Sequence, residues 1–413
     1  MTKEFAYYPG CASCSTGRAY ELSSQYMTKQ IGLELKEITD WCCCGASAAH
    51  TINHDLGLAL PARNLAISQD EYPGLDVLAT CAACYARLKN TQHYVNQSEE
   101  NRAHIEYLIE REYRGEENVY SLLQAIVDNE DLKEAMVAAL TKSLNGLKVA
   151  CYYGCMLVRP VEVTQFDNEE NPQSMEELLR LAGAEPVDWA FKTECCGASL
   201  QVTQPETGKN MVEIILRNAK ENGAEVIATA CPLCQLNLDM RENEVNRSLH
   251  KDYEFPVYYF TELLSMCMGA TPNEIGIDKH YIPAVASAEN AVAEREPEPE
   301  PDPEAEAEAK EIARAEARAK AQAKREAREA AKAAEAAETE AADAADVEAV
   351  VAEAEAVIAE AGAAEAPAEA EAESRDDRPR SSAPDSDDNT NQVDDQGRSS
   401  LQEPQVAEEG DAS

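Results

Sequence analysis

Short runs rich in β-branched and aromatic residues alternate with longer stretches of helical periodicity as far as about residue 270. In the first half this pattern predicts strands at 5–8, 35–41 and 76–80, and helices at 18–31, 56–69 and 82–94. In the second half it predicts strands at 149–153, 185–189 and 226–229, and helices at 174–182, 209–222 and 232–241. Such alternation is typical of βαβ units, so the predicted fold class is α/β, with two tandem duplicated domains of short parallel sheets and flanking helices.

Two segments fall outside this alternation. Residues 98–145 are predicted to form a charged helical insert, with helices at 105–113 and 132–144 that serve packing and linkage. After residue 285 the chain has no aromatic residue and consists mainly of Ala, Glu, Pro, Asp and Ser, so it cannot bury a core. The predicted organisation is a first domain over 1–145, a second over 146–284 and an acidic low-complexity tail over 285–413.

Composition changes again within the tail. Residues 296–303 are Glu, Pro and Asp with alternating prolines, which favours an extended spacer. Residues 304–361 are almost entirely Ala, Glu, Arg and Lys, which predicts a helix held in solvent by its intrinsic propensity and by Glu-to-Lys/Arg pairs. Residues 362–413 are predicted to be disordered.

The formal net charge of −42 disfavours a nucleic-acid partner, because a polyanion repels phosphate and no basic stripe is present. The N-terminal residues lack the basic start and apolar run of a signal peptide, and no apolar run is long enough to predict a membrane span. We therefore expect a cytoplasmic, reducing setting. In that setting clustered cysteines are expected to bind metal or take part in catalysis rather than form disulfides.

Ten of the fourteen cysteines fall into two copies of one pattern. The first copy has Cys11, then the pair Cys43-Cys44 after 31 residues, then Cys81-Ala-Ala-Cys84 after 36 more. The second copy contains the same blocks with gaps of 39 and 34 residues, and its members are Cys155, Cys195, Cys196, Cys231 and Cys234. Glycine follows the cysteine pair in both copies. The flanking residues also match, which indicates a duplicated unit of about 140 residues.

Each cysteine block is predicted to follow a strand. Because the carboxyl ends of parallel strands share one edge of a sheet, cysteines that are distant in sequence should converge there. Cys84 and Cys234 are also predicted in the first turn of a helix, where the helix dipole favours thiolate over thiol.

Three kinds of centre compete for each five-cysteine set. Structural zinc needs four ligands and does not explain an adjacent pair, whose chelate ring around one small ion would be strained. An ordinary cubane cluster usually shows the close Cys-x-x-Cys-x-x-Cys spacing, which the sequence lacks. A larger, open iron–sulfur cluster accommodates all five thiolates, because adjacent cysteines can bridge two metal atoms.

At this level of detail the chain resembles the B subunit of heterodisulfide reductase, which is built from two cysteine-rich CCG domains. The family pattern is Cys, 31–39 residues, Cys-Cys, 35–36 residues, Cys-x-x-Cys. The first copy fits fully, and the second has a gap one residue short. The resemblance covers residues 4–270 or so and leaves the tail unmatched.

The resemblance implies two noncubane [4Fe-4S] clusters that together cleave a disulfide of small thiols. One cluster would be held by Cys11, Cys43, Cys44, Cys81 and Cys84, and the other by Cys155, Cys195, Cys196, Cys231 and Cys234. Cys42 and Cys151 compete with assigned ligands. The pair Cys43-Cys44 is chosen because Gly45 must follow it, and Cys155 because Gly154-Cys155 aligns with Gly10-Cys11. The remaining cysteines, Cys14, Cys42, Cys151 and Cys267, are interpreted as small buried hydrophobic residues.

Several cationic residues lie near the cysteine blocks in the sequence and could bind an anionic substrate. The alternative interpretation is that they are surface or capping side chains without such a role. The candidates are His50, His54, Arg18, Arg87 and Arg159. No flavin or nicotinamide fingerprint is present, so electrons should come from partners, which by resemblance are the iron–sulfur C subunit and the flavin-containing A subunit of such a complex.

Two other functions remain open. One is an electron-transfer iron–sulfur subunit of a glycolate/lactate or succinate/fumarate type oxidoreductase, whose chains usually carry a fused ferredoxin segment. The other is a zinc-stabilised scaffold without redox activity.

Overall fold

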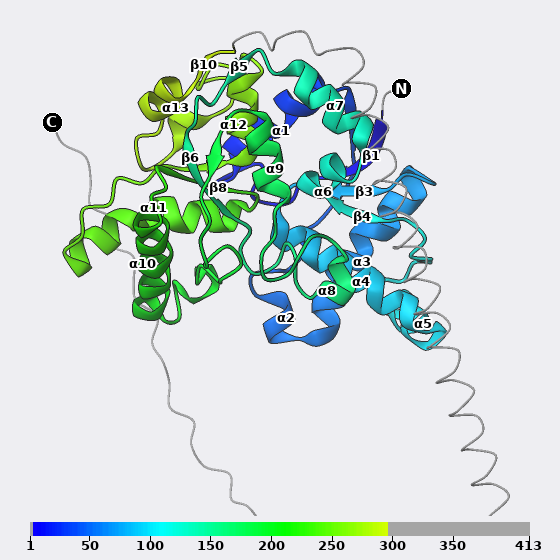
Figure 1. Cartoon of the computed structure of the whole chain (residues 1–413). Coiled ribbons are helices and arrows are strands. Elements are labelled where there is room, and N and C mark those ends of the chain that lie inside the picture. Colours follow the sequence, from blue (N-terminus) through cyan, green and yellow to red (C-terminus); the bar gives the residue numbers. More distant parts are fainter. Residues whose placement is uncertain (1–2, 296–413) are drawn as a thin grey trace, which may run out of the picture. The chain divides into compact units, whose positions relative to one another are not determined.

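The computed structural model describes residues 3–295, so the predicted spacer, helix and disordered segment of the tail lie outside it. Two sheets of four parallel strands organise this part of the chain (Figure 1). The first sheet has the order β2-β1-β3-β4 and contains β1 (Lys3–Tyr8), β2 (Leu33–Glu37), β3 (Val77–Ala79) and β4 (Val119–Ser121). The second has the order β7-β6-β8-β9 and contains β6 (Lys148–Tyr152), β7 (Glu185–Pro186), β8 (Val226–Thr229) and β9 (Val257–Tyr259). The two orders are equivalent, which confirms the predicted α/β fold class with short parallel sheets.

Helices connect the strands of each sheet. The first domain contains α1 (Arg18–Gln30), α2 (Ala49–Ile52), α3 (His54–Glu71), α4 (Ala82–Gln97), α5 (Glu99–Ile109), α6 (Leu122–Val127) and α7 (Glu130–Ala139). The second contains α8 (Val161–Thr164), α9 (Ser174–Leu181), the 3-10 turn η1 (Ala198–Leu200), α10 (Pro205–Glu221), α11 (Pro232–Leu249), α12 (Phe260–Cys267), the 3-10 turn η2 (Ile277–Lys279) and α13 (Val285–Ala291). The sequence predicted most of these elements to within a few residues at one or both ends.

Two predicted strands are shorter than expected. The strand predicted at 35–41 ends at Glu37, because the backbone turns at Asp40, whose φ is +46°. The Arg63 guanidinium holds this turn through the Asp40 carboxylate. The strand predicted at 185–189 ends at Pro186 on the edge of its sheet, and the Val187 N–H still donates to the Val149 carbonyl at 2.9 Å. In both domains a loop therefore carries the chain from the strand to the cysteine pair.

The prediction of a helical insert over 98–145 is wrong in its centre. β4 lies there and pairs in parallel with β3, with Val119 opposite Val77. The sequence match between Val119-Tyr-Ser and Val257-Tyr-Tyr already marked this segment, since β9 is its counterpart in the second sheet. The helical pattern of the residues on either side nevertheless led to the prediction of a continuous helical insert.

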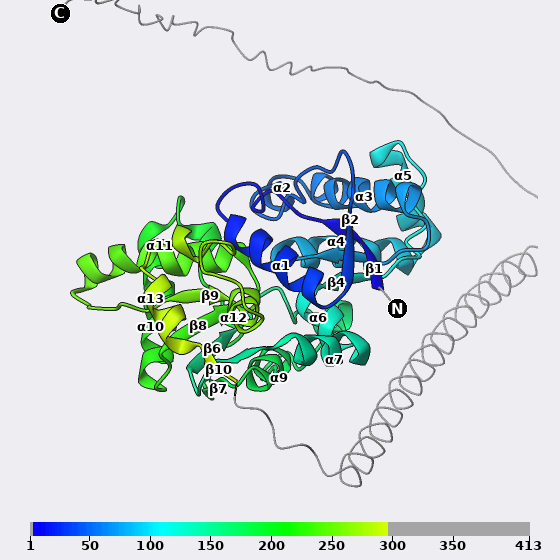
Figure 2. The same ribbon diagram turned by 90° about the horizontal axis from the view of Figure 1, so that it is seen from above.

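The two domains pack through an approximately two-fold arrangement of helices (Figure 2). α1 of the first domain packs against α12 of the second, and α6 of the first packs against α9 of the second. α9 follows β6 as α1 follows β1, and α12 follows β9 as α6 follows β4. The two contacts are therefore equivalent. At the centre the Tyr20 and Tyr259 rings stack, with centroids 4.4 Å apart and an interplanar angle of 2°. The Ser23 and Thr261 hydroxyls join the helices at 2.7 Å.

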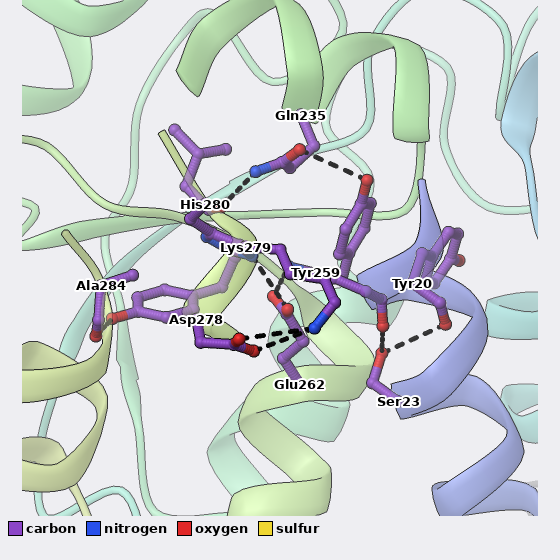
Figure 3. A network of polar contacts seen from close by, with 12 residues as sticks. Tyr20, Ser23, Gln235, Tyr259, Glu262, Asp278, Lys279, His280 and Ala284 are labelled. Atoms are coloured by element: carbon purple, nitrogen blue, oxygen red, sulfur yellow. Dashed lines mark hydrogen bonds and ion pairs between the residues drawn. The ribbon is translucent and has the colours of Figure 1, made fainter. Parts of the chain in front are cut away.

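A buried ion pair fixes the start of α12 (Figure 3). Glu262 lies 2.9 Å from His280 Nε2, and both side chains are almost fully buried. The same carboxylate accepts the Tyr259 backbone N–H at 2.8 Å, which caps the helix. Burial opposes protonation of His280, but the Glu262 carboxylate outweighs it and raises the pKa of the imidazole. The network therefore anchors Tyr259 where it meets the first domain.

The described fold continues past the predicted boundary at 284/285. α13 follows that point, and β10 (Ala293–Glu294) pairs in antiparallel fashion with β5 (Lys142–Ser143). Ala288 of α13 is buried, and the Tyr258 hydroxyl donates to the Ala284 carbonyl at 2.6 Å. Within residues 3–295 no helix is long and apolar enough to cross a membrane.

Two truncations should separate the fold from the tail. A chain that ends at Pro299 should keep the unfolding temperature of the full chain, because the residues beyond it carry no aromatic side chain that could extend the core. A chain that ends at Ala284 loses α13 and β10 and should lose about 2 kcal/mol of unfolding free energy. Thermal and urea unfolding measure both effects. Equal stability of the two truncated chains would show that α13 and β10 do not support the fold.

Candidate iron–sulfur site

The ten predicted cysteines converge on two neighbouring places at the domain interface. Cys11 follows β1, and Cys81 follows β3 at the N-cap position of α4. In the second domain Cys155 follows β6, and Cys231 follows β8 at the N-cap position of α11. Because the strands are parallel, their carboxyl ends bring these residues to one edge of each sheet. α4 and α11 both begin at this edge, so the positive ends of their dipoles lie beside the thiols.

Sulfur–sulfur distances show that each set is closely grouped. Cys43 Sγ lies 3.8 Å from Cys11 Sγ, and Cys44 Sγ lies 3.4 Å from Cys84 Sγ. In the second set Cys196 Sγ lies 3.6 Å from Cys234 Sγ.

The two sets also meet each other. Ala82 and Ala83, which separate Cys81 from Cys84, line one cavity with Cys231 and Cys234 of the other domain. The Cys231 thiol raises the pKa of Cys81, and Cys234 and then Cys81 lower the pKa of Cys231. Burial raises the pKa of the Tyr20 and Tyr259 hydroxyls, and both cysteines raise it further. The stacked tyrosines thus lie near the place where the two sets meet.

Proton sharing distinguishes the thiols within a set. A hydrogen bond from Cys43 lowers the pKa of Cys44 to about 3, while the same bond raises the pKa of Cys43. A hydrogen bond from Cys155 lowers the pKa of Cys195 to about 6 and raises the pKa of Cys155. In each domain the fold therefore favours a thiolate at the cysteine pair, and thiolate is the form that binds metal.

Equivalent tyrosines position the two cysteine pairs. The Tyr8 hydroxyl donates to the Cys42 carbonyl at 2.7 Å, and the Tyr152 hydroxyl donates to the Glu194 carbonyl at 2.6 Å. In both cases the acceptor immediately precedes the pair. Tyrosine occurs before the glycine and cysteine of both copies, so the sequence repeat contained this signal although it did not reveal the role.

Glycines leave room for the sulfur atoms. A Cβ on Gly10 would lie 3.0 Å from Cys84 Sγ, and a Cβ on Gly154 would lie 3.1 Å from Cys234 Sγ. The glycines after the pairs have φ near +75°, and their N–H groups point at Cys43 Sγ and Cys195 Sγ at 3.5 and 3.4 Å. The predicted requirement for Gly45 after the chosen pair has this geometric basis.

The four remaining cysteines lie apart from the sets. Cys151 and Cys267 are buried in β6 and α12, as expected for small hydrophobic residues. Cys42 is half-buried with its sulfur 3.7 Å from the Leu60 carbonyl, and it makes no sulfur contact with the first set. Cys14 is exposed, so the expectation that it is buried is wrong. It lies in the turn between Cys11 and α1, where solvent reaches its sulfur.

The predicted substrate cations occupy different places. His50 lines a cavity of about 210 Å³ that is bounded by the second cysteine set and by Ala82 and Ala83 of the first domain. Arg159 lines an adjoining opening with Cys155, where it pairs with Glu170. His54 is exposed beside Asp55, and Arg18 lines a separate cavity with Lys279 and His280. The structure brings two of the five candidates, His50 and Arg159, near the second cysteine set, and Arg87 follows Cys84 on α4 in the first domain.

The donor set suits a group larger than one ion. Each set offers five thiols, of which three are buried and two face solvent or are half-buried. Within residues 3–295 no three Cys, His, Asp or Glu side chains are placed to share one metal ion. A multi-iron cluster does not need such a group, since each iron binds only one or two protein thiolates. Among the described residues the buried hydroxyls of Tyr20 and Thr229 lack hydrogen-bond partners, which leaves donors beside the two sets.

Comparison with known proteins agrees with this geometry. The family description "Cysteine-rich domain" (CCG) matches residues 5–89 and 149–239, one match in each domain. The chain is 27% identical to the B subunit of the ferredoxin/F420H2-dependent CoB-CoM heterodisulfide reductase of Methanosarcina acetivorans, over 68% of this chain and 94% of that protein. It is 30% identical to the 8-methylmenaquinol:fumarate reductase membrane anchor subunit of Wolinella succinogenes, over 69% of this chain and 99% of the relative.

The chain belongs to the family of heterodisulfide reductase B subunits. A protein of Archaeoglobus profundus named as similar to these B subunits is also related, with 27% identity over 66% of this chain and 93% of that protein. Among solved structures, a hypothetical protein from Helicobacter pylori has a similar fold, with a TM-score of 0.54 and 13% identity, over 68% of this chain and 52% of that one. These relatives are matched over 93–99% of their own lengths, whereas the match covers 66–69% of this chain.

Substitution of Gly10 tests how closely the backbone is fitted to the sulfur. Gly10→Ala should lower the unfolding free energy through the positive φ of +73°, by roughly 1–2 kcal/mol, and through crowding against Cys84 Sγ, by a further ~1 kcal/mol. Gly32→Ala is the matched control, because its φ is +71° but nothing lies within 4 Å of the added Cβ. Anaerobic urea unfolding gives the difference between the variants. Equal losses would mean that Gly10 is needed only for its backbone conformation.

Proposed function

We propose that this chain is the disulfide-reducing subunit of a heterodisulfide reductase-like complex. The observation that carries the proposal is the meeting of the two five-cysteine sets at the domain interface, where Ala82 and Ala83, between Cys81 and Cys84, line one cavity with Cys231 and Cys234. Reductive cleavage of a disulfide takes two electrons and separates two sulfur atoms. Two equivalent sites beside one cavity offer one position for each sulfur.

The proposed cofactors are two noncubane [4Fe-4S] clusters. The first is assigned to Cys11, Cys43, Cys44, Cys81 and Cys84, and the second to Cys155, Cys195, Cys196, Cys231 and Cys234. When bound, such clusters supply single electrons and an iron that can hold a thiolate sulfur. The family membership and the grouping of the thiols support this assignment.

The residues around the cavity at the second set give the substrate a mostly apolar surround. Ala82, Ala83 and Leu233 line it together with the cysteines, while Ser47 and Ser199 supply hydroxyls from the segments after the two cysteine pairs. Apolar walls exclude water and keep a newly formed thiolate away from solvent. We assign His50, which lines this cavity, and Arg159, which lines the adjoining opening, to contact with a charged substituent of the substrate.

Partner subunits complete the proposal. Electrons are proposed to arrive from an iron–sulfur C subunit, itself reduced by a flavin-containing A subunit, in the cytoplasm. The names of the relatives as subunits of heterodisulfide reductases support the existence of partners.

A second candidate function is electron transfer within a fumarate-reductase-type oxidoreductase. The relative from Wolinella succinogenes favours it, because that protein is matched over 99% of its length and is named as part of a fumarate reductase. In that case the two sets would pass electrons on without binding a disulfide.

Metal content tests the cofactor assignment. Anaerobically prepared protein should contain about eight irons per chain. Cys44→Ser and Cys196→Ser should each remove about half of this iron, because each changes a buried member of one set. Cys42→Ser is the matched control, since Cys42 neighbours the first pair but its sulfur lies elsewhere. Stoichiometric zinc without iron would support the scaffold interpretation instead, and equal iron loss in Cys42→Ser would show that the pair is misassigned.

Reaction with a disulfide separates the two functions. Iron-replete protein reduced by an artificial donor should release two thiols for every two electrons when a small disulfide is added. Cys44→Ser and Cys196→Ser should each lose this activity by at least 100-fold, as expected when one of two cooperating sites is removed. Thiol counting and loss of the reduced spectrum report the reaction. Reduced protein that keeps its electrons in the presence of disulfides, yet gives them to a fumarate-reducing flavoprotein, would favour electron transfer.

A further inference from the structure

The two cysteine sets are built alike but are surrounded by different charges. In the first domain Arg87 lies three residues after Cys84 on α4, on the same face of the helix. In the second domain Asn237 lies three residues after Cys234 on α11. A cation and a neutral amide therefore occupy equivalent positions behind equivalent cysteines.

Arg87 is held close to the first cysteine pair. Its Nη2 donates to the Gly57 carbonyl at 2.7 Å, and a Cβ on Gly57 would lie 3.0 Å from the same nitrogen, so a glycine leaves space for the guanidinium. Among residues 3–295 its buried Nε has no hydrogen-bond partner. The guanidinium is thus only partly satisfied by the protein around it.

The charge of Arg87 is fixed beside the first set. Arg87 follows Cys84 by one helical turn on α4, and Cys84 Sγ lies 3.4 Å from Cys44 Sγ. The hydrogen bond to the Gly57 carbonyl ties the half-buried guanidinium to α3, a helix that follows the first cysteine pair.

The second set lacks this cation and has an acid nearby. Asn237 is buried, and its Nδ2 donates to the Cys196 carbonyl at 2.8 Å, which fixes the backbone without adding charge. Glu194 immediately precedes Cys195, so the backbone that carries the second cysteine pair also carries a carboxylate. The equivalent residue in the first domain is Cys42, which carries no fixed charge. Arg159, which lines an opening with Cys155, is already paired with Glu170, so these two differences leave the first set with the more positive surroundings.

We propose that the two sets hold centres of unequal reduction potential, and that Arg87 makes the N-terminal centre the easier one to reduce. This inference rests on the proposed function, since it requires an iron–sulfur centre at each set. An added electron makes a cluster more negative, and a nearby, partly desolvated cation stabilises that state more than an oxidised one. The first of the two electrons needed for disulfide cleavage therefore rests in the N-terminal domain.

Single-centre proteins allow each potential to be measured alone. Cys196→Ser should keep the N-terminal centre and Cys44→Ser the C-terminal one, with iron analysis as the check. Each full-length protein is titrated with dithionite and mediators, one electron per centre, and followed by EPR. The N-terminal centre should be reduced at the higher potential.

Substitutions in these backgrounds test the cause. In Cys196→Ser, Arg87→Asn installs the residue of the other domain and should shift the reduction equilibrium at least tenfold toward the oxidised form, about 59 mV for one electron. Arg87→Lys retains the charge and should shift it less. Arg217→Asn is the control, because it removes a half-exposed arginine that pairs with Glu213 on α10. In Cys44→Ser, Glu194→Gln should shift the C-terminal centre toward the reduced form.

The outcomes separate the inference from the function on which it rests. Protein without iron would contradict the proposed function. Iron-replete protein whose centres titrate at one potential, or whose N-terminal potential is unchanged by Arg87→Asn, would overturn the inference alone. Arg87→Asn could also fail to keep iron. In that case the inference is tested by comparing the reduction potentials of the two single-centre proteins and by the effect of Glu194→Gln. Equal potentials and no shift in Glu194→Gln would overturn the inference.

Discussion

Two cysteine sets from different domains can lie beside one cavity, as Ala82, Ala83, Cys231 and Cys234 show, because the carboxyl ends of two separate sheets face each other across the domain interface. The rest of the described structure satisfies this constraint. Parallel strands bring each set of cysteines to one sheet edge, and the paired contacts of α1 with α12 and α6 with α9 turn the two edges together. Gly17 permits the close approach, since a Cβ there would lie 2.8 Å from Pro232 of the other domain.

Duplication explains why the interface is approximately symmetric. The symmetry does not extend to the charged residues around the two cysteine sets. The backbone features that hold the sulfur atoms recur in both halves, including the tyrosine that holds the pair and the glycine beside the helix cysteine. Groups further from the sulfur have diverged, as Arg87 and Asn237 show. Steric fit around a sulfur atom tolerates few side chains, whereas a charge one helical turn away changes energetics without changing the fold.

The sequence predicted the parts of the molecule that depend on local pattern. Hydrophobic periodicity located β8 at its observed residues and most helices within a few residues, and the cysteine spacing identified the two sets. It failed where tertiary context decides the outcome. β4 has only three residues, and their strand character depends on pairing with β3. The role of Tyr20 could not be predicted, because its partner Tyr259 is more than two hundred residues away and no local pattern links the two.

The exposure of the cysteines bears on which set an oxidant in solution reaches first. Cys44, Cys81 and Cys84 are buried in the folded domain, while Cys11 and Cys43 lie at its surface. In the second domain the two outer cysteines, Cys155 and Cys195, are half-buried instead. Dissolved oxygen therefore meets unprotected sulfur at the first set, whereas the second set is partly shielded by its own domain.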